Sequence, residues 1–363
     1  MHSVVALVVS VFLLGLLVIV HELGHFVVAR WAGVRILRFS VGFGPRLFAW
    51  TRGHTEYAVS GIPLGGYVKM AGEQRAEGAP EPYEYRAKPV GVRVGIIFAG
   101  PFINYVVALA SLWVVFIVGF PELLPVVGRV MPDMPAQAAG LRVGDRILAI
   151  DGQPMGTWEE MTKAIYRSPD VPLTLDIERA GATLQVTVRP KPRVVADPYG
   201  RPSQVGLIGV APSGEFVTTK VGPLAAVGRT IVQQNEWTVQ TFTALWLLAT
   251  GKLGLRDSVT GPIGIVYLTS EAVRMGLSPL LFLISLFSLS LAIFNLLPIP
   301  ILDGGHLFFL ALEKLRGRPV SLLIQERSAQ VSFVLLMSLV LVICIGDLSR
   351  FGLLDKLAHW WGK

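Results

Sequence analysis

The chain has 363 residues, of which 52% are hydrophobic and only 16% are charged. Soluble domains carry about 25% charged residues, and disordered chains combine low hydrophobicity with high charge, so the composition argues against both classes. The single cysteine, Cys344, excludes an internal disulfide framework and the cysteine-rich zinc folds. The net charge of +7 needs no nucleic-acid partner if the basic residues gather in cytoplasmic loops.

Four stretches free of Asp, Glu, Lys and Arg are long enough to cross a bilayer, which takes about 20 residues of helix. They are residues 1–21, 94–121, 275–302 and 328–346. We therefore expect an α-helical polytopic membrane protein with about four transmembrane helices. The first stretch lacks a basic start and a small-residue cleavage site, so we expect a retained span rather than a signal peptide.

The HELGH motif at residues 21–25 directly follows the first apolar run. On a helix, His21 and His25 are four residues apart and face the same side, so both imidazoles can bind one Zn²⁺ ion. Glu22 is placed beside them to take a proton from the attacking water. Ionisable residues inside a membrane helix are costly and indicate a functional site.

Loop charge predicts the orientation in the membrane. Residues 30–93 carry ten Lys or Arg against five Glu, and residues 314–327 carry four Lys or Arg. The positive-inside rule places both loops in the cytoplasm, with the two termini and residues 122–270 on the other side. Residues 237–251 are uncharged but too short to span, so we expect an interfacial amphipathic helix there.

Residues 122–192 are expected to form a small α/β domain outside the membrane. Two short strand patterns lie between residues 126 and 150, and Thr157 with Glu160 forms a capping box that opens a helix. A hairpin is expected around residues 180–181. This order, with AGLRVGDRILAIDGQPM at its centre, resembles a PDZ domain of the bacterial protease type, which implies binding of an extended extracytoplasmic peptide. The alternative is a spacer domain without a ligand.

The domain organisation follows from these elements. Residues 1–121 are expected to form the first half of a membrane core and residues 271–363 its second half. Residues 193–270, rich in Pro and Gly at their start, are expected to be a linker followed by the interfacial helix.

A catalytic zinc ion usually has three protein ligands and one open position. Asp303 is the expected third ligand, because it lies where the third span meets the leaflet that holds His21. Pro298 and Pro300 prevent regular helix there, and irregular backbone at membrane depth is tolerated only beside protein or a water-filled cavity. We therefore expect this segment to form an active-site wall, with Pro298 and Pro300 among the substrate-binding residues. His306 is the rival ligand.

The chain resembles the site-2 protease family, in the order of its bacterial RseP-type branch of intramembrane zinc metalloproteases. The resemblance rests on HELGH, on Asn295-x-x-Pro298-x-Pro300-x-Leu302-Asp303-Gly304 and on a PDZ domain between the second and third spans. It implies that His21, His25 and Asp303 bind zinc and that Glu22 is the general base and acid. It also implies that Asn295 helps to bind the substrate.

Two further segments resemble parts of this family. Residues 36–70, which include Gly42 and Gly44, resemble a membrane-reentrant β-structure, and an exposed edge between Gly42 and Ser60 would hold a substrate as an added strand. The second-span motif, Gly100-Pro101 with Asn104, is expected to serve packing and helix kinking. Only one convincing PDZ copy is visible, whereas the branch's best-known members carry two.

The resemblance implies an endopeptidase that cleaves transmembrane segments of single-pass membrane proteins, such as anti-sigma factors or signal-peptide remnants, in regulated intramembrane proteolysis. It implies the bacterial cytoplasmic (inner) membrane as location, with the active site toward the cytoplasm and the PDZ domain outside. The alternative is a catalytically silent, PDZ-bearing membrane scaffold, which would require a broken ligand set or base. A transporter with a midplane ion site fits the intramembrane ionisable groups but not the external domain.

Overall fold

Four helices among the described residues are long and apolar enough to cross a membrane, which confirms the number of predicted spans. The first helix continues past residue 21, because a helix satisfies its own backbone groups and need not end where ionisable side chains begin. The spans are Leu7–Trp31 within α1 (His2–Trp31), α2 (Val90–Val118), α8 (Leu277–Asn295) and Leu322–Leu348 within α10 (Leu322–Arg350).

The computed structural model describes residues 2–73, 80–196, 202–254 and 260–350. Its contacts divide the chain into two units, which we describe separately. The membrane unit comprises residues 1–114, 229–241 and 254–363, and the soluble unit comprises residues 115–228 and 242–253.

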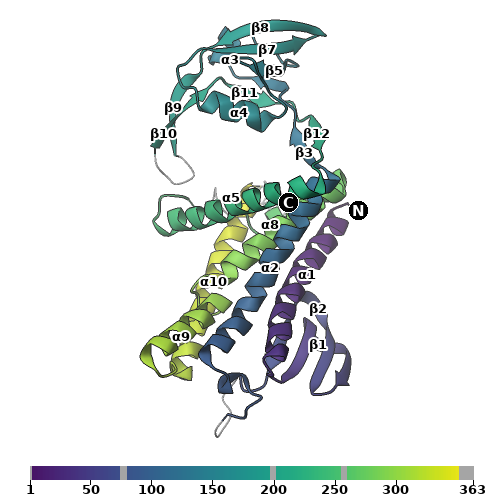
Figure 1. The fold of residues 1–363 in the computed structure, drawn as a ribbon, viewed down its shortest axis with the longest axis vertical. Coiled ribbons are helices and arrows are strands. Elements are labelled where there is room, and N and C mark those ends of the chain that lie inside the picture. Colours follow the sequence, from purple (N-terminus) through teal and green to yellow (C-terminus); the bar gives the residue numbers. More distant parts are fainter. Residues whose placement is uncertain (1, 74–79, 197–201, 255–259, 351–363) are drawn as a thin grey trace, which may run out of the picture. The chain divides into compact units, whose positions relative to one another are not determined.

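In the membrane unit, two buried hydroxyl groups join α2 to α8. Ser285 Oγ donates to the carbonyl of Ala108 and Ser288 Oγ donates to the carbonyl of Asn104, each over 2.8 Å. Interhelical hydrogen bonds of this kind hold membrane helices together where lipid supplies no hydrophobic driving force. Figure 1 shows α1, α2 and α8 running alongside one another.

The last span is tied to the helix α7 (Pro262–Met275) by a buried carboxylate. Asp347 of α10 is 3% exposed and accepts hydrogen bonds from the backbone N–H groups of Gly261 and Gly264, over 3.3 and 3.0 Å. The first N–H groups of a helix have no partner within the helix, and a negative charge is favourable there. Asp347 therefore caps α7.

A long bent hairpin, β1 (Ile36–Arg52) and β2 (Thr55–Met70), packs against α1 (Figure 1). Residues 36–41 pair with residues 66–70 on one side and with residues 55–60 on the other, while residues 46–52 pair only with 55–60. Both strands therefore fold back on themselves into four segments. The bends contain Gly42, Gly44 and Gly65 at φ values of 88°, 83° and 124°, a region that favours glycine.

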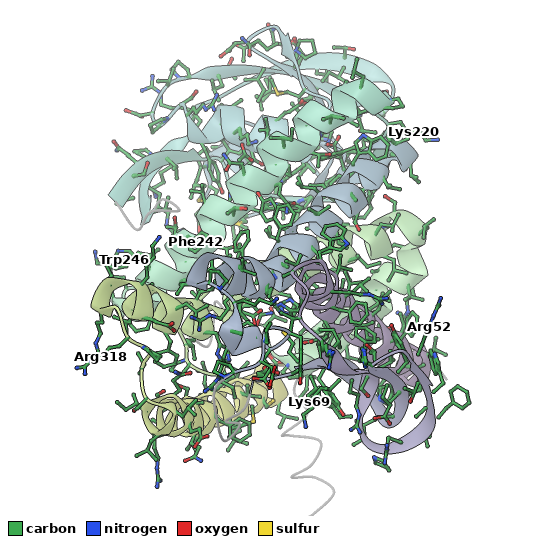
Figure 2. The ribbon with its side chains drawn as sticks, turned by 60° about the horizontal axis from the view of Figure 1, so that its bottom comes forward. Arg52, Lys69, Lys220, Phe242, Trp246 and Arg318 are labelled. Atoms are coloured by element: carbon green, nitrogen blue, oxygen red, sulfur yellow. The ribbon has the colours of Figure 1, made fainter. Side chains whose placement is uncertain are left out.

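Among the described basic residues of the two loops predicted to be cytoplasmic, some are exposed and others are ion-paired. Arg52 and Lys69 of the hairpin and Arg318 after α9 (Asp303–Arg316) have exposed side chains (Figure 2). Arg93 of α2 instead forms a bidentate ion pair with Glu313 of α9, over 3.1 and 2.5 Å. This pair fixes the start of α2 against the end of α9. The short 3₁₀ helix η1 (Tyr85–Ala87) precedes α2.

The soluble unit has the element order expected of the small α/β domain. Thr157 Oγ1 accepts from the N–H of Glu160 and the Glu160 carboxylate accepts from the N–H of Thr157, so the predicted capping box is confirmed. The predicted hairpin at residues 180–181 is also present. The central sheet has the order β6 (Gln153–Pro154), β5 (Arg146–Ile150), β7 (Leu173–Arg179) and β8 (Ala182–Val188), accompanied by α3 (Pro135–Ala138) and α4 (Trp158–Tyr166).

The segment expected to be a linker differs from that expectation. It contains further strands, and Ile208 joins the buried core of the soluble unit at 3% exposure. Two of these strands, residues 191–196 and 202–207, contain Pro, which argues against a strand when only the sequence is read. The predicted interfacial helix, residues 237–251, overlaps the second half of α5, which begins earlier, at Pro223, because Pro is favourable at the first helical position. The outer strand pairs are β3 (Phe120–Leu123) with β12 (Phe216–Thr219), β4 (Val127–Val130) with β11 (Val210–Pro212) and β9 (Lys191–Ala196) with β10 (Pro202–Leu207), and α5 spans Pro223–Ala249.

Candidate active site

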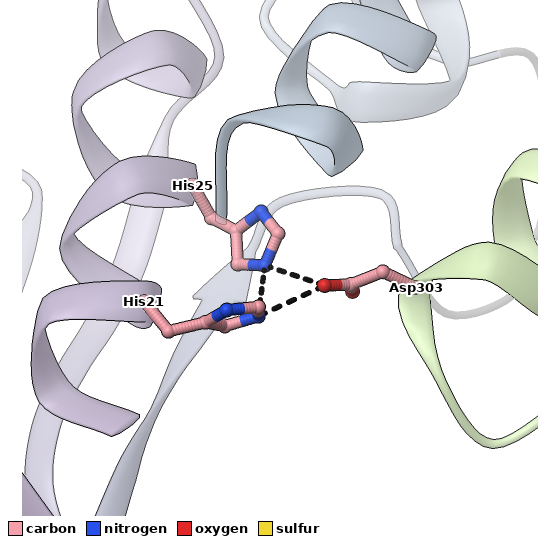
Figure 3. A group of neighbouring side chains, drawn as sticks. All are labelled: His21, His25 and Asp303. Carbon is pink, nitrogen blue, oxygen red and sulfur yellow. Dashed lines mark hydrogen bonds and ion pairs between the residues drawn. The ribbon is translucent and has the colours of Figure 1, made fainter. Parts of the chain in front are cut away.

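Three side chains from distant parts of the sequence converge in the membrane unit (Figure 3). His21 and His25 project from one face of α1, and Asp303 is the first residue of α9. Asp303 Oδ2 lies 2.8 Å from His21 Nε2 and 3.4 Å from His25 Nε2, and the two Nε2 atoms are 3.2 Å apart. Both histidines are buried, at 6% and 5% exposure.

This arrangement fits a tetrahedral metal ion. Ligand atoms about 2.0–2.1 Å from a zinc ion are separated from one another by about 3.3–3.4 Å in tetrahedral geometry. Two of the three observed separations, 3.4 and 3.2 Å, are close to that value, and the third, 2.8 Å, is shorter. Among the described residues, Asp303 Oδ2 is buried without a hydrogen bond of good geometry, although it lies beside His21 Nε2. The three ligand atoms therefore lie close enough together to surround one shared centre.

His25 is oriented by the backbone of α2. Its Nδ1 lies 2.8 Å from the carbonyl oxygen of Ile96, which can only accept, so Nδ1 carries the proton. The lone pair of His25 then resides on Nε2, the atom that faces Asp303. Metal-binding histidines commonly donate their other ring N–H to a carbonyl in this way.

Glu22 is held by the edge of the hairpin. Its Oε2 accepts a hydrogen bond from the backbone N–H of Val68, over 3.0 Å. Val68 lies in the 66–70 segment of β2, which pairs with β1 on one side only, so its N–H is free to face α1. The hairpin therefore positions the carboxylate that the sequence predicts to be the general base.

Gly100 of α2 lies directly against the two histidine ligand atoms. A Cβ atom at this position would lie 2.4 Å from His25 Nε2 and 2.7 Å from His21 Nε2. Any side chain there would occupy the space where the two ligand atoms meet. The next residue, Pro101, lacks the N–H that would otherwise bond the carbonyl of Ile97. Sequence reasoning assigned Gly100 to packing and kinking, and missed its position at the ligand atoms.

Asp303 is placed by the irregular segment that precedes α9. α8 ends at Asn295, and residues 296–302 form turns rather than helix. A Cβ atom on Gly304 would lie 2.1 Å from the carbonyl oxygen of Leu297, and one on Gly305 would lie 2.4 Å from that of Ile299. The two glycines let the first turn of α9 fold against this segment, which fixes the position of the Asp303 carboxylate.

The cluster opens into a cavity of about 830 Å³ within the membrane unit. Glu22, His25 and Asp303 line it together with Tyr67 and Val68 of β2. Further lining residues come from α2, α9 and the start of α10, and they include the Arg93–Glu313 ion pair. Burial raises the pKa of the Tyr85 phenol in this lining, so that group stays neutral and can donate a hydrogen bond. The cluster therefore borders a cavity large enough to hold several water molecules.

Of the other predicted site residues, His306 lines this cavity and the remaining five do not. Gly42 and Gly44 are in the bend of the hairpin, and Asn295, Pro298 and Pro300 belong to the end of α8 and the turn segment; none of these five lines the cavity. Their substrate-binding roles remain predictions. His306 lines the cavity but does not belong to the His21–His25–Asp303 group.

Known proteins that are similar in sequence match most of this chain. The sequence model of peptidase family M50 matches residues 9–339. The regulator of sigma-E protease RseP of Salmonella typhimurium is 32% identical over 93% of this chain and 97% of its own length. The zinc metalloprotease RasP of Geobacillus kaustophilus is 31% identical over 97% of this chain and 99% of its own. The PDZ domain of an SdrC-like protein from Listeria monocytogenes aligns with 26% of this chain and 88% of its own length, at 22% identity and a TM-score of 0.20.

Proposed function

Because this chain belongs to peptidase family M50, it is an intramembrane zinc metalloprotease, and we propose that His21, His25 and Asp303 hold its zinc ion. The convergence of these three ligand atoms, from segments that are distant in the sequence, carries the proposal. When bound, zinc polarises the scissile carbonyl and supplies a nucleophile by lowering the pKa of water to about 7. The remaining chemistry belongs to side chains of this chain.

Glu22 is the proposed general base and acid. Its Oε2 is held by the N–H of Val68, and a carboxylate has a second oxygen that can accept a proton. Glu22 takes the proton of the attacking water and later delivers it to the leaving amide nitrogen, so that the peptide bond breaks without releasing an amide anion. Burial of the cluster limits competing water and strengthens these electrostatic contacts.

The substrate is a membrane protein, and we propose that its cleaved segment is a transmembrane helix that becomes extended at the site. A helix hides its peptide bonds in internal hydrogen bonds, so it must unwind before it can be cut. Residues 66–70 form the hairpin edge beside Glu22, and the Gly42–Ser60 stretch contains the opposite edge, residues 46–52. An edge strand can accept an added strand. Single-pass proteins such as anti-sigma factors or signal-peptide remnants fit this requirement, as does regulated intramembrane proteolysis.

We further propose that the PDZ domain binds an extracytoplasmic peptide and that the protein resides in the bacterial inner membrane. The basic loops then lie in the cytoplasm, the cluster lies toward that side, and the PDZ domain lies outside. This orientation follows from loop charge.

The test combines metal content with cleavage. Purified wild type should contain about one zinc ion per chain and cleave a model transmembrane substrate in detergent. Replacing either histidine by Ala should lower both zinc content and cleavage. Equal zinc content in wild type, His21→Ala and His25→Ala would refute the ligand assignment. Asp303→Asn should also weaken zinc binding, and a site emptied by His306→Ala but not by Asp303→Asn would make His306 the third ligand.

A further inference from the structure

Asn104 lies in α2, one helical turn after Gly100, and its side chain is fully buried. Its Nδ2 lies 3.4 Å from His21 Nδ1, the ring nitrogen of His21 that faces away from Asp303. In this orientation, among the described residues, the other end of the amide, Oδ1, is buried without a hydrogen-bond partner. A buried polar atom without a partner costs free energy, so the amide orientation needs a physical explanation.

The explanation comes from the proton of His21. A neutral imidazole carries one N–H, and a histidine that binds a metal through Nε2 must carry that proton on Nδ1. An amide N–H facing Nδ1 would instead require the proton on Nε2, which would leave no lone pair there for a metal. The two ends of an amide have nearly the same size, so a half-turn about its terminal bond exchanges them. After that rotation, Oδ1 accepts from His21 Nδ1–H, which leaves the lone pair of His21 on Nε2, and Nδ2 takes the position that Oδ1 had occupied.

We infer that Asn104 is the positioning residue of His21, with its amide oxygen accepting a hydrogen bond from His21 Nδ1–H whenever His21 Nε2 binds the metal. The inference rests on the proposed zinc site. It completes a symmetrical pattern, since Ile96 accepts from His25 Nδ1 in the same way, and both acceptors belong to α2. One helix thus sets the tautomer of both histidines. The backbone of Asn104 is also held in place, because its backbone carbonyl accepts a hydrogen bond from Ser288 Oγ over 2.8 Å.

The rival explanation is that Asn104 only fills space between α1, α2 and α8. Three variants distinguish the positioning role of Asn104 from this packing role. Asn104→Asp keeps the size and an acceptor oxygen, Asn104→Leu keeps the approximate size without any acceptor, and Ser288→Ala disturbs the α2–α8 contact while leaving the amide intact. The affinity for zinc would be measured by competition with a chelator in detergent, and the ligand geometry by the visible spectrum of the cobalt-substituted protein.

Asn104→Leu should bind zinc about 10–100-fold more weakly, the usual effect of removing a hydrogen-bond partner of a metal-binding histidine. Asn104→Asp and Ser288→Ala should stay within a few-fold of wild type and keep its cobalt spectrum. The inference is overturned if Asn104→Leu binds zinc like wild type, if Asn104→Asp loses as much affinity as Asn104→Leu, or if Ser288→Ala does so.

A second measurement needs no variant that could misfold. In zinc-loaded wild type with ¹⁵N-labelled histidine, the resonances of His21 should show a protonated Nδ1 and a metal-bound Nε2. A metal-bound Nδ1 would overturn the inference and leave the zinc site in place. A wild-type protein that binds no zinc would refute the proposed function as well, so the two failures are distinguishable.

Discussion

Glu22 has the most direct proposed role in the reaction, because its carboxylate, held by the backbone N–H of Val68, transfers the proton. Gln is nearly isosteric with Glu, so Glu22→Gln should leave the helix and the zinc content close to wild type. It removes the group that accepts and returns the proton, and general acid–base groups are worth about 10²–10⁴-fold in rate. Cleavage of a model transmembrane substrate should fall by at least that factor, with zinc content measured in parallel. A zinc-loaded Glu22→Gln protein that cleaves within a few-fold of wild type would leave Glu22 without this role.

Gly100 provides a steric test of the same site. In Gly100→Ala the new methyl group would overlap both Nε2 atoms, so zinc affinity should fall by at least about 10-fold, the lower end of the usual cost of changes next to a metal site. Gly95→Ala is a matched control, because a Cβ at that position of the same helix meets no atom within 4 Å. Chelator competition on both proteins measures the difference. Equal losses in the two variants would mean that α2 as a whole, rather than the space at Gly100, is sensitive.

The residues of this site differ in how far the sequence could reveal them. The histidine pair and Glu22 were predictable because their spacing within one helix already places them together. Asp303 was predicted from the proline-interrupted segment before it, with His306 as a rival, and the resemblance implied the same ligand. The roles of Gly100 and of the Val68 N–H depend on how closely neighbouring elements approach, which no local pattern encodes. The Gly-Pro motif with Asn104 four residues after the Gly was the available signal for α2.

At the level of elements, the hairpin edge can be tested without touching a catalytic side chain. Val68→Pro removes the N–H that Glu22 accepts from, and proline is tolerated on an edge strand whose N–H is not part of the ladder. A hydrogen bond to a charged group is worth about 1.5–3 kcal/mol, so cleavage should fall about 10–100-fold while zinc content is unchanged. Val68→Ala keeps the N–H and should cleave like wild type. Normal cleavage by Val68→Pro would show that the hairpin does not position the base.

The soluble unit contains an ion pair that should make its stability depend on pH. Asp145 is fully buried and pairs with Arg179 through two contacts of 2.7 Å. Burial opposes its charge, but Arg179 and the N–H of Arg142 outweigh burial and hold the pKa of Asp145 below its usual range. Because the folded pKa lies below the unfolded value of about 3.9, the pair stabilises the fold above about pH 4 and this contribution is lost as the pH falls further.

Amide hydrogen exchange in β5 and β7 at about pH 6 and about pH 3, corrected for intrinsic exchange rates, measures this effect. Protection should fall at the lower pH in wild type. Asp145→Asn should start with lower protection and show a smaller further loss. The same pH dependence in both proteins would assign it to other groups.

Some features of the secondary structure could be predicted from the sequence, and others could not. The four apolar helices and the capped helix of the soluble unit have strong local signals, and the structure contains all of them. The sequence predicts a hairpin over residues 36–70. It does not predict that residues 36–41 pair with both arms of β2. That pairing is set by the glycine bends and by packing against α1, so it depends on contacts between residues far apart in the sequence.

For the whole molecule, the orientation in the membrane is a direct prediction from loop charge. In a Cys344→Ser background, a cysteine introduced as Arg316→Cys should be labelled from the cytoplasm, and one introduced as Gln153→Cys should be labelled from the opposite side. Both positions are exposed within their own units. Labelling of Gln153→Cys from the cytoplasm would overturn the four-span topology.

Metal removal should act on one unit and not on the other. Anything that binds only the folded state stabilises it, by about 2.7 kcal/mol at a free concentration 100 times the dissociation constant. A chelator should therefore lower the unfolding temperature of the membrane unit, while hydrogen exchange in the soluble unit stays unchanged. His21→Ala should show no response to the chelator. An equal response in His21→Ala and wild type would mean that the chelator acts elsewhere.

The separation of the ligands along the chain has a consequence for evolution. His25 and Asp303 are 278 residues apart (303 − 25), and the soluble unit is inserted between them. The entropy cost of closing a flexible loop grows only with the logarithm of its length, so doubling an insertion adds about 0.6 kcal/mol. A split metal site of this kind can accept a longer, shorter or duplicated inserted module at little thermodynamic penalty. The catalytic half-sites and the module between them are therefore free to diversify at different rates.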